Sequence, residues 1–119
     1  MISKANVEVE LDVFAGRPNP TWKLPEDLSG RLIREAAQLQ VIENLEMFEG
    51  LGYRGFLLHF GQAETWRVQG EILEINQAGA TIYKQDKSRR IEGSLLESGR
   101  PYLDEKIFQK LEREIRAKY

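Results

Sequence analysis

The chain has 119 residues, of which 41% are hydrophobic and 30% charged, so it is long and apolar enough for one folded domain and is not a disordered chain. It has no cysteine and one histidine, His59, which excludes disulfide scaffolds, cysteine nucleophiles and multi-histidine metal sites. The formal net charge of −2 provides no basic excess for phosphates, so we expect no nucleic-acid partner.

The first predicted element is a strand over residues 7–14, where apolar side chains alternate with acidic ones. That alternation is typical of a strand with one face on a core and one face toward water. Residues 15–22 follow as an ordered turn or extended loop, because Pro18 and Pro20 fix two φ angles and remove two backbone donors. Apolar residues at helical spacing then predict a helix over 25–40.

Residues 41–52 are too apolar for a free linker, and we expect a packed loop with room for one helical turn. Three strands are predicted next, over residues 53–60, 66–75 and 81–85. Five-residue connections join them as a meander of hairpins. In the second of these strands the apolar parity switches at 70–73, which indicates a bulge or a strong bend.

Two helices are predicted at the end of the chain. Asp86 is a candidate N-cap for a short helix that Gly99 and Pro101 end, and Asp104 caps the last helix. The order is therefore strand, helix, strand, strand, strand, helix, helix. It predicts a single α+β domain over residues 1–119, in two layers: a largely antiparallel four-stranded sheet with helices packed on one face.

Targeting and cofactor motifs are missing from the sequence. No apolar h-region follows Met1, and no apolar run approaches the ~20 residues that span a bilayer, so we expect a cytoplasmic protein with no membrane partner. Fingerprints for nucleotides and calcium are also missing, and we expect no cofactor and no metal. A small-molecule ligand, a protein partner and a homo-oligomer all stay open.

The strongest local feature is the segment Phe14–Trp22, which reads Phe-Ala-Gly-Arg-Pro-Asn-Pro-Thr-Trp. As a stiff loop it would present Arg17, Asn19 and Trp22 to a ligand, and a pre-ordered loop loses less entropy on binding. These residues supply a planar fork of donors, an amide and an aromatic wall. In a simpler interpretation the segment only redirects the chain, with Trp22 in the core, Asn19 bonded to its own backbone and Arg17 solvated.

A second feature is the segment 52–56, Gly-Tyr-Arg-Gly-Phe, at the start of a predicted strand. In a binding site, Tyr53 is a candidate wall and Arg54 a candidate charge partner. If the first two predicted strands are neighbours, Arg54 forms a two-arginine anion site with Arg17. In the simpler interpretation the glycines supply positive φ at a loop end and Arg54 lies on a wet face.

Asp12 and His59 are the candidate catalytic residues. Asp12 lies just before the proline-rich segment and is a candidate base or a partner that orients Arg17. His59 is a candidate general acid–base residue with Asp12 as its orienter. In the simpler interpretation Asp12 is one of three acids on a solvated strand face and His59 is a packed or solvated filler.

These residues support three hypotheses for function. The first is a binding or accessory protein that recognises an anionic or polar small molecule, or a partner chain, through the Arg17–Trp22 loop. The alternative is a small metal-independent enzyme, a lyase, isomerase or hydrolase, in which Asp12 or His59 moves protons and Arg17 stabilises negative charge. The third is a subunit of a larger assembly that uses an uncovered sheet face or a strand edge.

Overall fold

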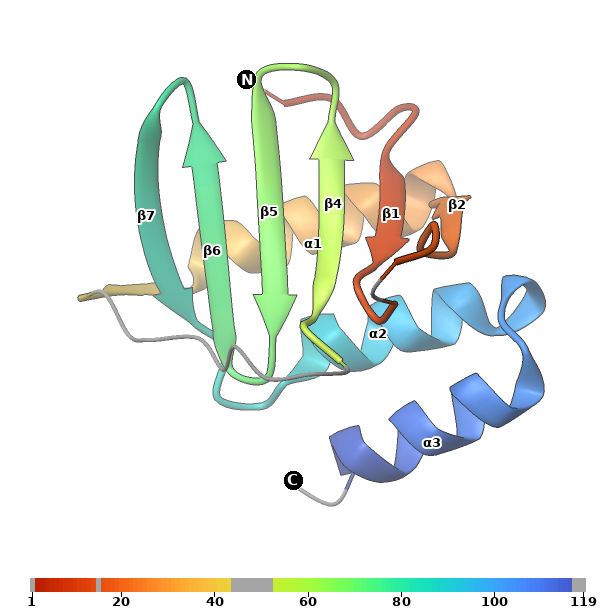
Figure 1. Ribbon diagram of the computed structural model, residues 1–119. Coiled ribbons are helices and arrows are strands. Elements are labelled where there is room, and N and C mark those ends of the chain that lie inside the picture. Colours follow the sequence, from red (N-terminus) through yellow and green to blue (C-terminus); the bar gives the residue numbers. More distant parts are fainter. Residues whose placement is uncertain (1, 15, 44–52, 117–119) are drawn as a thin grey trace.

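Seven strands form one antiparallel sheet in the computed structural model, which describes residues 2–14, 16–43 and 53–116 (Figure 1). They are β1 (Glu8–Leu11), β2 (Thr21–Lys23), β3 (Gln40–Ile42), β4 (Phe56–Phe60), β5 (Glu64–Gln69), β6 (Ile72–Gln77) and β7 (Ala80–Gln85). Their order across the sheet is β2-β1-β4-β5-β6-β7-β3. The strands β1 and β4 are therefore neighbours, although a helix and two other strands separate them in the chain.

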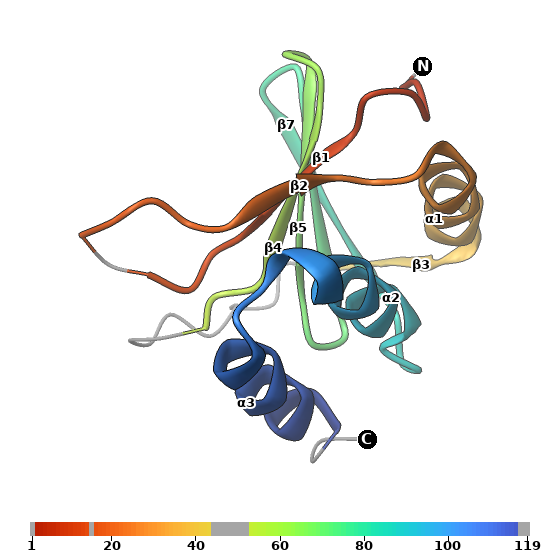
Figure 2. The same cartoon turned by 90° about the vertical axis from the view of Figure 1, so that its right-hand side faces the viewer.

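Two of the helices cover one side of the sheet. The helical elements are α1 (Glu26–Gln38), α2 (Arg90–Gly99), the short 3-10 helix η1 (Arg100–Tyr102) and α3 (Glu105–Arg116). Figure 2 shows α1 and α2 on the same side of the sheet, and α3 packs against α2. On the other side, no helix lies over the sheet in the described part of the chain. We call this uncovered side the open face.

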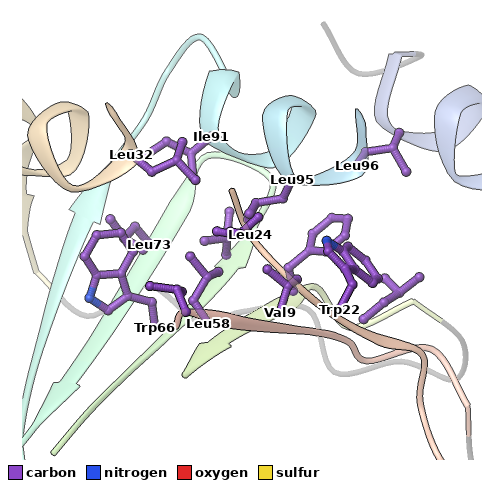
Figure 3. Packing of buried hydrophobic residues seen from close by; sticks show 14 of the residues in the cluster. Val9, Trp22, Leu24, Leu32, Leu58, Trp66, Leu73, Ile91, Leu95 and Leu96 are labelled. Carbon is purple, nitrogen blue, oxygen red and sulfur yellow. The ribbon is translucent and has the colours of Figure 1, made fainter. Parts of the chain in front are cut away.

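The core lies between the sheet and helices α1 and α2 (Figure 3). Leu32 of α1 and the α2 residues Ile91 and Leu95 are buried with sheet residues such as Trp66 and Leu73. Successive side chains of a strand point to opposite faces, and β4 and β5 show the alternating burial that this predicts. Each of these strands therefore gives one side to the core and the other to the open face.

The sheet has seven strands rather than the predicted four, and one reason is a tight hairpin within residues 66–75. This stretch is not one bent strand: β5 and β6 pair antiparallel, with Val68 opposite Leu73. Gly70 makes the turn between them with a φ of +61°, a left-handed conformation that glycine adopts readily. The parity switch in the sequence was therefore the signature of a turn and not of a bulge.

The other two additional strands are short and lie at the two edges of the sheet. The strand β2 falls in the segment that we predicted as a loop, and its central residue Trp22 lies opposite Val9. The strand β3 includes the start of the predicted packed loop 41–52, and Ile42 lies opposite Tyr83. The rest of that loop, 44–52, lies outside the described residues. Three residues are too few for a strand to show a periodic pattern.

The last helix begins where the sequence indicates, whereas α2 begins at Arg90, three residues later than an N-cap at Asp86 would place it. The Asp86 carboxylate accepts the Ile91 N–H at 2.9 Å, although Arg89, with a φ of +57°, directly precedes the helix. The Asp104 carboxylate accepts the Lys106 N–H at 2.8 Å at the start of α3. Both acids therefore satisfy a first-turn donor, as expected of residues at a helix N-terminus.

Candidate functional site

The strands β1 and β4 bring two predicted site residues together at their ends. The Asp12 N–H donates to the Gly55 carbonyl at 3.0 Å, and the Arg54 N–H donates to the Asp12 carbonyl at 2.8 Å. These bonds continue the antiparallel ladder beyond the last paired residues, Leu11 and Phe56. Asp12 and Arg54 therefore leave the sheet side by side, although they lie 42 positions apart in the sequence.

Two arginines share the carboxylate of Asp12. Arg54 donates to Oδ1 from Nε (3.2 Å) and Nη2 (2.8 Å), and Arg67 of β5 donates to Oδ2 from Nη1 (3.1 Å). Arg67 Nη1 also donates to the Arg54 carbonyl at 2.8 Å. Partial burial raises the pKa of Asp12, but the hydrogen bonds and charges of the two arginines outweigh burial and hold this pKa below its ordinary value. The carboxylate is therefore ionised at neutral pH.

Gly55 is required for this arrangement. Its φ is +100°, and a Cβ at this position would lie 2.5 Å from the Val68 carbonyl oxygen on β5. Only glycine combines that conformation with such a close approach of two backbones. The close approach occurs beside Arg54, whose carbonyl oxygen accepts the bond from Arg67. The glycine after Arg54 thus serves the packing of β4 on β5.

The β1–β2 loop, residues 12–20, is held by the side chain of Asn19. Its Oδ1 accepts two backbone N–H groups, those of Val13 at 3.1 Å and Phe14 at 2.9 Å. Its Nδ2 donates to Oε2 of Glu10 at 2.9 Å. One amide side chain therefore joins the start of the loop, the end of the loop and strand β1, as asparagine often does in turns. Asn19 bonds local backbone, as the simpler interpretation held, and also contacts the side chain of Glu10.

Phe14 is fixed in this loop from three directions. Its N–H is bonded to Asn19, its carbonyl oxygen accepts from Arg54 Nη2 at 3.3 Å, and the Arg17 guanidinium lies 3.7 Å from the centre of its ring. Arg17 is exposed, and its N–H groups have no hydrogen-bond acceptor among the described residues. The Phe14 ring therefore supports an exposed guanidinium.

His59 lies on the same face and contacts Glu10. The distance from His59 Nε2 to Glu10 Oε1 is 3.3 Å, and both side chains are partly exposed. Glu10 therefore bridges His59 and Asn19, with one carboxylate oxygen for each. The carboxylate beside His59 is Glu10, whereas the sequence interpretation made Asp12 its orienter; Asp12 is engaged with the two arginines.

A second polar cluster lies between α2 and the β5–β6 turn, and its central residue is buried. Glu92 of α2 is completely buried, and its Oε1 accepts from Arg89 Nε (3.1 Å) and Nη2 (2.6 Å). Its Oε2 accepts from the Tyr53 hydroxyl at 2.6 Å and from the Gly70 N–H at 2.8 Å. Burial and the Glu92 charge raise the pKa of Tyr53 well above its ordinary value, so its hydroxyl stays a donor. This cluster joins α2 to the β5–β6 turn.

Two predicted ligand contacts belong to the interior. Trp22 is 4% exposed, stacks on Tyr102 and donates its indole N–H to the Ser98 hydroxyl at 2.9 Å. Tyr53 is half-buried and uses its hydroxyl on Glu92. The other predicted residues, Asp12, Arg17, Asn19, Arg54 and His59, lie around the β1–β2 loop and the open face.

The sequence interpretation missed the second arginine of the cluster. The predicted two-arginine site combined Arg17 with Arg54, and both contact Phe14, but the guanidinium that shares Asp12 with Arg54 belongs to Arg67. One signal pointed to Arg67: it lies between Trp66 and Val68, which are buried, so it must face the other side of the sheet.

Comparisons with known proteins identify no relative of this chain. A scan against protein-family models found no match for this chain, and no curated protein or solved structure matches it.

Within the described ranges, no three His, Cys, Asp or Glu side chains are grouped so that they could hold a metal ion. Nor does any helix in those ranges have the length and apolar character needed to cross a membrane. The function must therefore be inferred from the geometry of the β1–β2 loop and its neighbours.

Proposed function

We propose that this chain is a recognition module that binds a carboxylate or phosphate group of a small molecule or of a partner chain through the β1–β2 loop. The observation that carries the proposal is the contact of the exposed Arg17 guanidinium with the Phe14 ring, without an acceptor for its N–H groups among the described residues. A guanidinium presents its N–H groups as a planar fork that matches carboxylate and phosphate oxygens. Arg17 is the residue that contacts the anion in this proposal.

The loop is organised before any ligand arrives, which supports the proposal. Asn19 accepts hydrogen bonds from two consecutive backbone N–H groups, and Arg54 donates to the Phe14 carbonyl. A turn needs a glycine or a proline, whereas this loop also bonds side chains of β1, of β5 and of Arg54, which precedes β4. Because these contacts fix Phe14, they also fix the platform on which Arg17 lies. Less conformational entropy is then lost when an anion binds.

The charges around Asp12 favour binding over proton transfer. Both of its oxygens accept from arginines, and its lowered pKa keeps it ionised, so it holds Arg54 and Arg67 in place. Asp12 neutralises one of these two positive charges. With Arg17 and Glu10 included, three arginines stand against two carboxylates around the loop, and the remaining positive charge favours an anion there.

The test compares Arg17 with a matched arginine. Arg100 is also exposed and also lies over an aromatic ring, 4.1 Å from the centre of Phe108, but it pairs with Glu97 and Glu112. Wild type, Arg17→Ala and Arg100→Ala would be screened by thermal shift against acetate, citrate, inorganic phosphate and a short acidic peptide. A bound ligand raises the midpoint because it stabilises the folded state by RT ln(1 + L/Kd), where L is the free ligand concentration.

We expect at least one of these anions to raise the midpoint of wild type and Arg100→Ala and to leave that of Arg17→Ala unchanged. The ligand that acts separates a small-molecule site from a site for a partner chain. The proposal is wrong if no probe shifts wild type, or if Arg17→Ala responds as wild type does.

A further inference from the structure

A chain of hydrogen bonds leads from the single histidine to the β1–β2 loop. His59 Nε2 lies 3.3 Å from Glu10 Oε1, and the other oxygen of Glu10 accepts from Asn19 Nδ2 at 2.9 Å. Asn19 in turn accepts the N–H groups of Val13 and Phe14. One oxygen of the Glu10 carboxylate thus contacts His59, and the other bonds Asn19, which holds the loop backbone.

Two acidic residues of β1 lie beside His59 on the same face of the sheet. In the sheet register Glu8 lies directly opposite His59 on β1, and Glu10 lies two residues further on the same face. On its other side, β5 presents the neutral Thr65 opposite His59. The nearest cations along the face are Arg67, whose guanidinium is bonded to Asp12, and Lys23, which lies opposite Glu8. Two carboxylates of β1 therefore lie beside the imidazole.

Protonation changes what His59 can do for Glu10. In a neutral imidazole one ring nitrogen is an acceptor, so Nε2 is a donor in only one of the two tautomers. In the charged imidazolium both nitrogens donate, and Nε2–H then always faces the carboxylate oxygen. The ion pair restrains Glu10 in the position that accepts Asn19. The restraint is present at low pH, while the imidazole is charged, and is lost at higher pH, once it is neutral.

We infer that His59 and Glu10 are positioning residues for the β1–β2 loop, which act through Asn19 and make the order of the loop depend on pH. The inference concerns the free protein, because the hydrogen-bond chain contains no ligand. Its consequence for recognition rests on the proposed function: anions at Arg17 would bind more tightly near pH 6 than near pH 8, since the loop that carries Phe14 is then better ordered.

Amide hydrogen exchange tests this inference without a ligand. The exchange rates of the Val13 and Phe14 amides would be measured by NMR at pH 6 and pH 8 and corrected for intrinsic chemical exchange. The Asp86 amide, which donates to the Glu71 carbonyl at 2.7 Å, reports opening elsewhere in the fold. In wild type we expect the protection of the two loop amides to be about two- to fivefold greater at pH 6, the range of a partly exposed ion pair. The Asp86 amide should not follow.

Three variants distinguish the effect of the hydrogen-bond chain through Glu10 and Asn19 from a general effect of charge near His59. His59→Gln keeps a polar side chain without titration and should remove the pH dependence of the two loop amides. Glu10→Ala should lower their protection at both pH values. Glu8→Ala removes the other carboxylate beside His59. Because Glu8 has no bond to Asn19, this variant should leave the protection of the two loop amides close to that of wild type.

The inference is wrong if wild-type protection is the same at both pH values, or if Glu8→Ala and Glu10→Ala have equal effects. These outcomes are distinct from failure of the proposed function, which is decided by the response of Arg17→Ala to anions.

Discussion

Gly99 of α2 lies so close to the indole of Trp22 that a Cβ on residue 99 would come within 2.6 Å of Trp22 Cζ2. The indole cannot move away easily, because its N–H is bonded to Ser98 and its ring lies between Tyr102 and Phe56. We therefore predict that Gly99→Ala lowers the free energy of unfolding by about 1–3 kcal/mol, the usual cost of overpacking a core. Urea denaturation at constant pH would measure it.

Gly30 is the matched control for this substitution, since it is also a buried helical glycine. A Cβ there would contact the flexible side chains of Lys4 at 3.3 Å and Arg34 at 3.4 Å, which can shift. Gly30→Ala should be neutral or stabilise α1 by up to about 1 kcal/mol through its helix propensity. Equal losses in the two variants would contradict the close packing of Gly99 on Trp22.

The buried Glu92 predicts a large loss of stability on truncation. Glu92→Ala would remove a completely buried side chain that is the acceptor for Tyr53, Gly70 and Arg89. Breaking a buried pair in this way costs about 3–5 kcal/mol. The control is Glu97→Ala on the same helix, because Glu97 is exposed and pairs with an exposed arginine, and it should change stability by less than about 1 kcal/mol. A small effect of Glu92→Ala would show that the cluster does not hold α2 to the sheet.

The Asp12 cluster predicts a specific dependence of stability on pH. Because the folded pKa of Asp12 lies below its ordinary value, the ionised carboxylate stabilises the fold above about pH 4 and this stability is lost as the pH falls through the folded pKa. Asp12→Asn should therefore be less stable than wild type at pH 7, by about 1.5–3 kcal/mol for charged hydrogen bonds. The difference should shrink below pH 4.

The control for this titration is Asp27→Asn at the exposed start of α1, which should cost less than about 1 kcal/mol. Urea denaturation of the three proteins at several pH values would decide. A difference between wild type and Asp12→Asn that does not change between pH 7 and pH 3 would contradict the role given to the two arginines.

The helices and the strands β1, β4 and β7 could be predicted because their patterns are local, whereas β5 and β6 were predicted as one bent strand. Strict alternation over residues 7–14 indicates β1, and a helical stripe with acids in its first turn indicates α1. The edge strands β2 and β3 could not be found in this way, since three residues contain no period. Even so, Trp22 between the polar Thr21 and Lys23 has the parity of a residue that faces a core.

The site depends on pairings between distant segments, and these are not written in any one motif. Arg54 meets Asp12 only because β1 pairs with β4, and Arg67 joins them only because of the register of β4 on β5. The sequence named Asp12 and Arg54 as candidates by residue type, but the role of Asp12 as a holder of arginines follows from the register. Glu10, one of three similar acids on β1, acquires its role from Asn19 and His59 in the same way.

Asn19 makes two kinds of contact in the β1–β2 loop, and two substitutions distinguish them. Asn19→Ala removes the acceptor of the Val13 and Phe14 N–H groups together with the donor to Glu10. It should lower the free energy of unfolding by about 1–3 kcal/mol, the cost of leaving partly buried donors unsatisfied. Asn19→Asp keeps an acceptor for both N–H groups but sets a second carboxylate against Glu10.

Asn19→Asp should therefore be intermediate in stability at pH 7 and should recover toward wild type at pH 3, since the repulsion between two carboxyl groups is relieved in acid. Urea denaturation at both pH values and the exchange of the Val13 and Phe14 amides would measure this. If Asn19→Asp and Asn19→Ala are equally destabilised at both pH values, the bonds from Asn19 Oδ1 to the backbone do not hold the loop. If both match wild type, Pro18 and Pro20 alone are sufficient to order it.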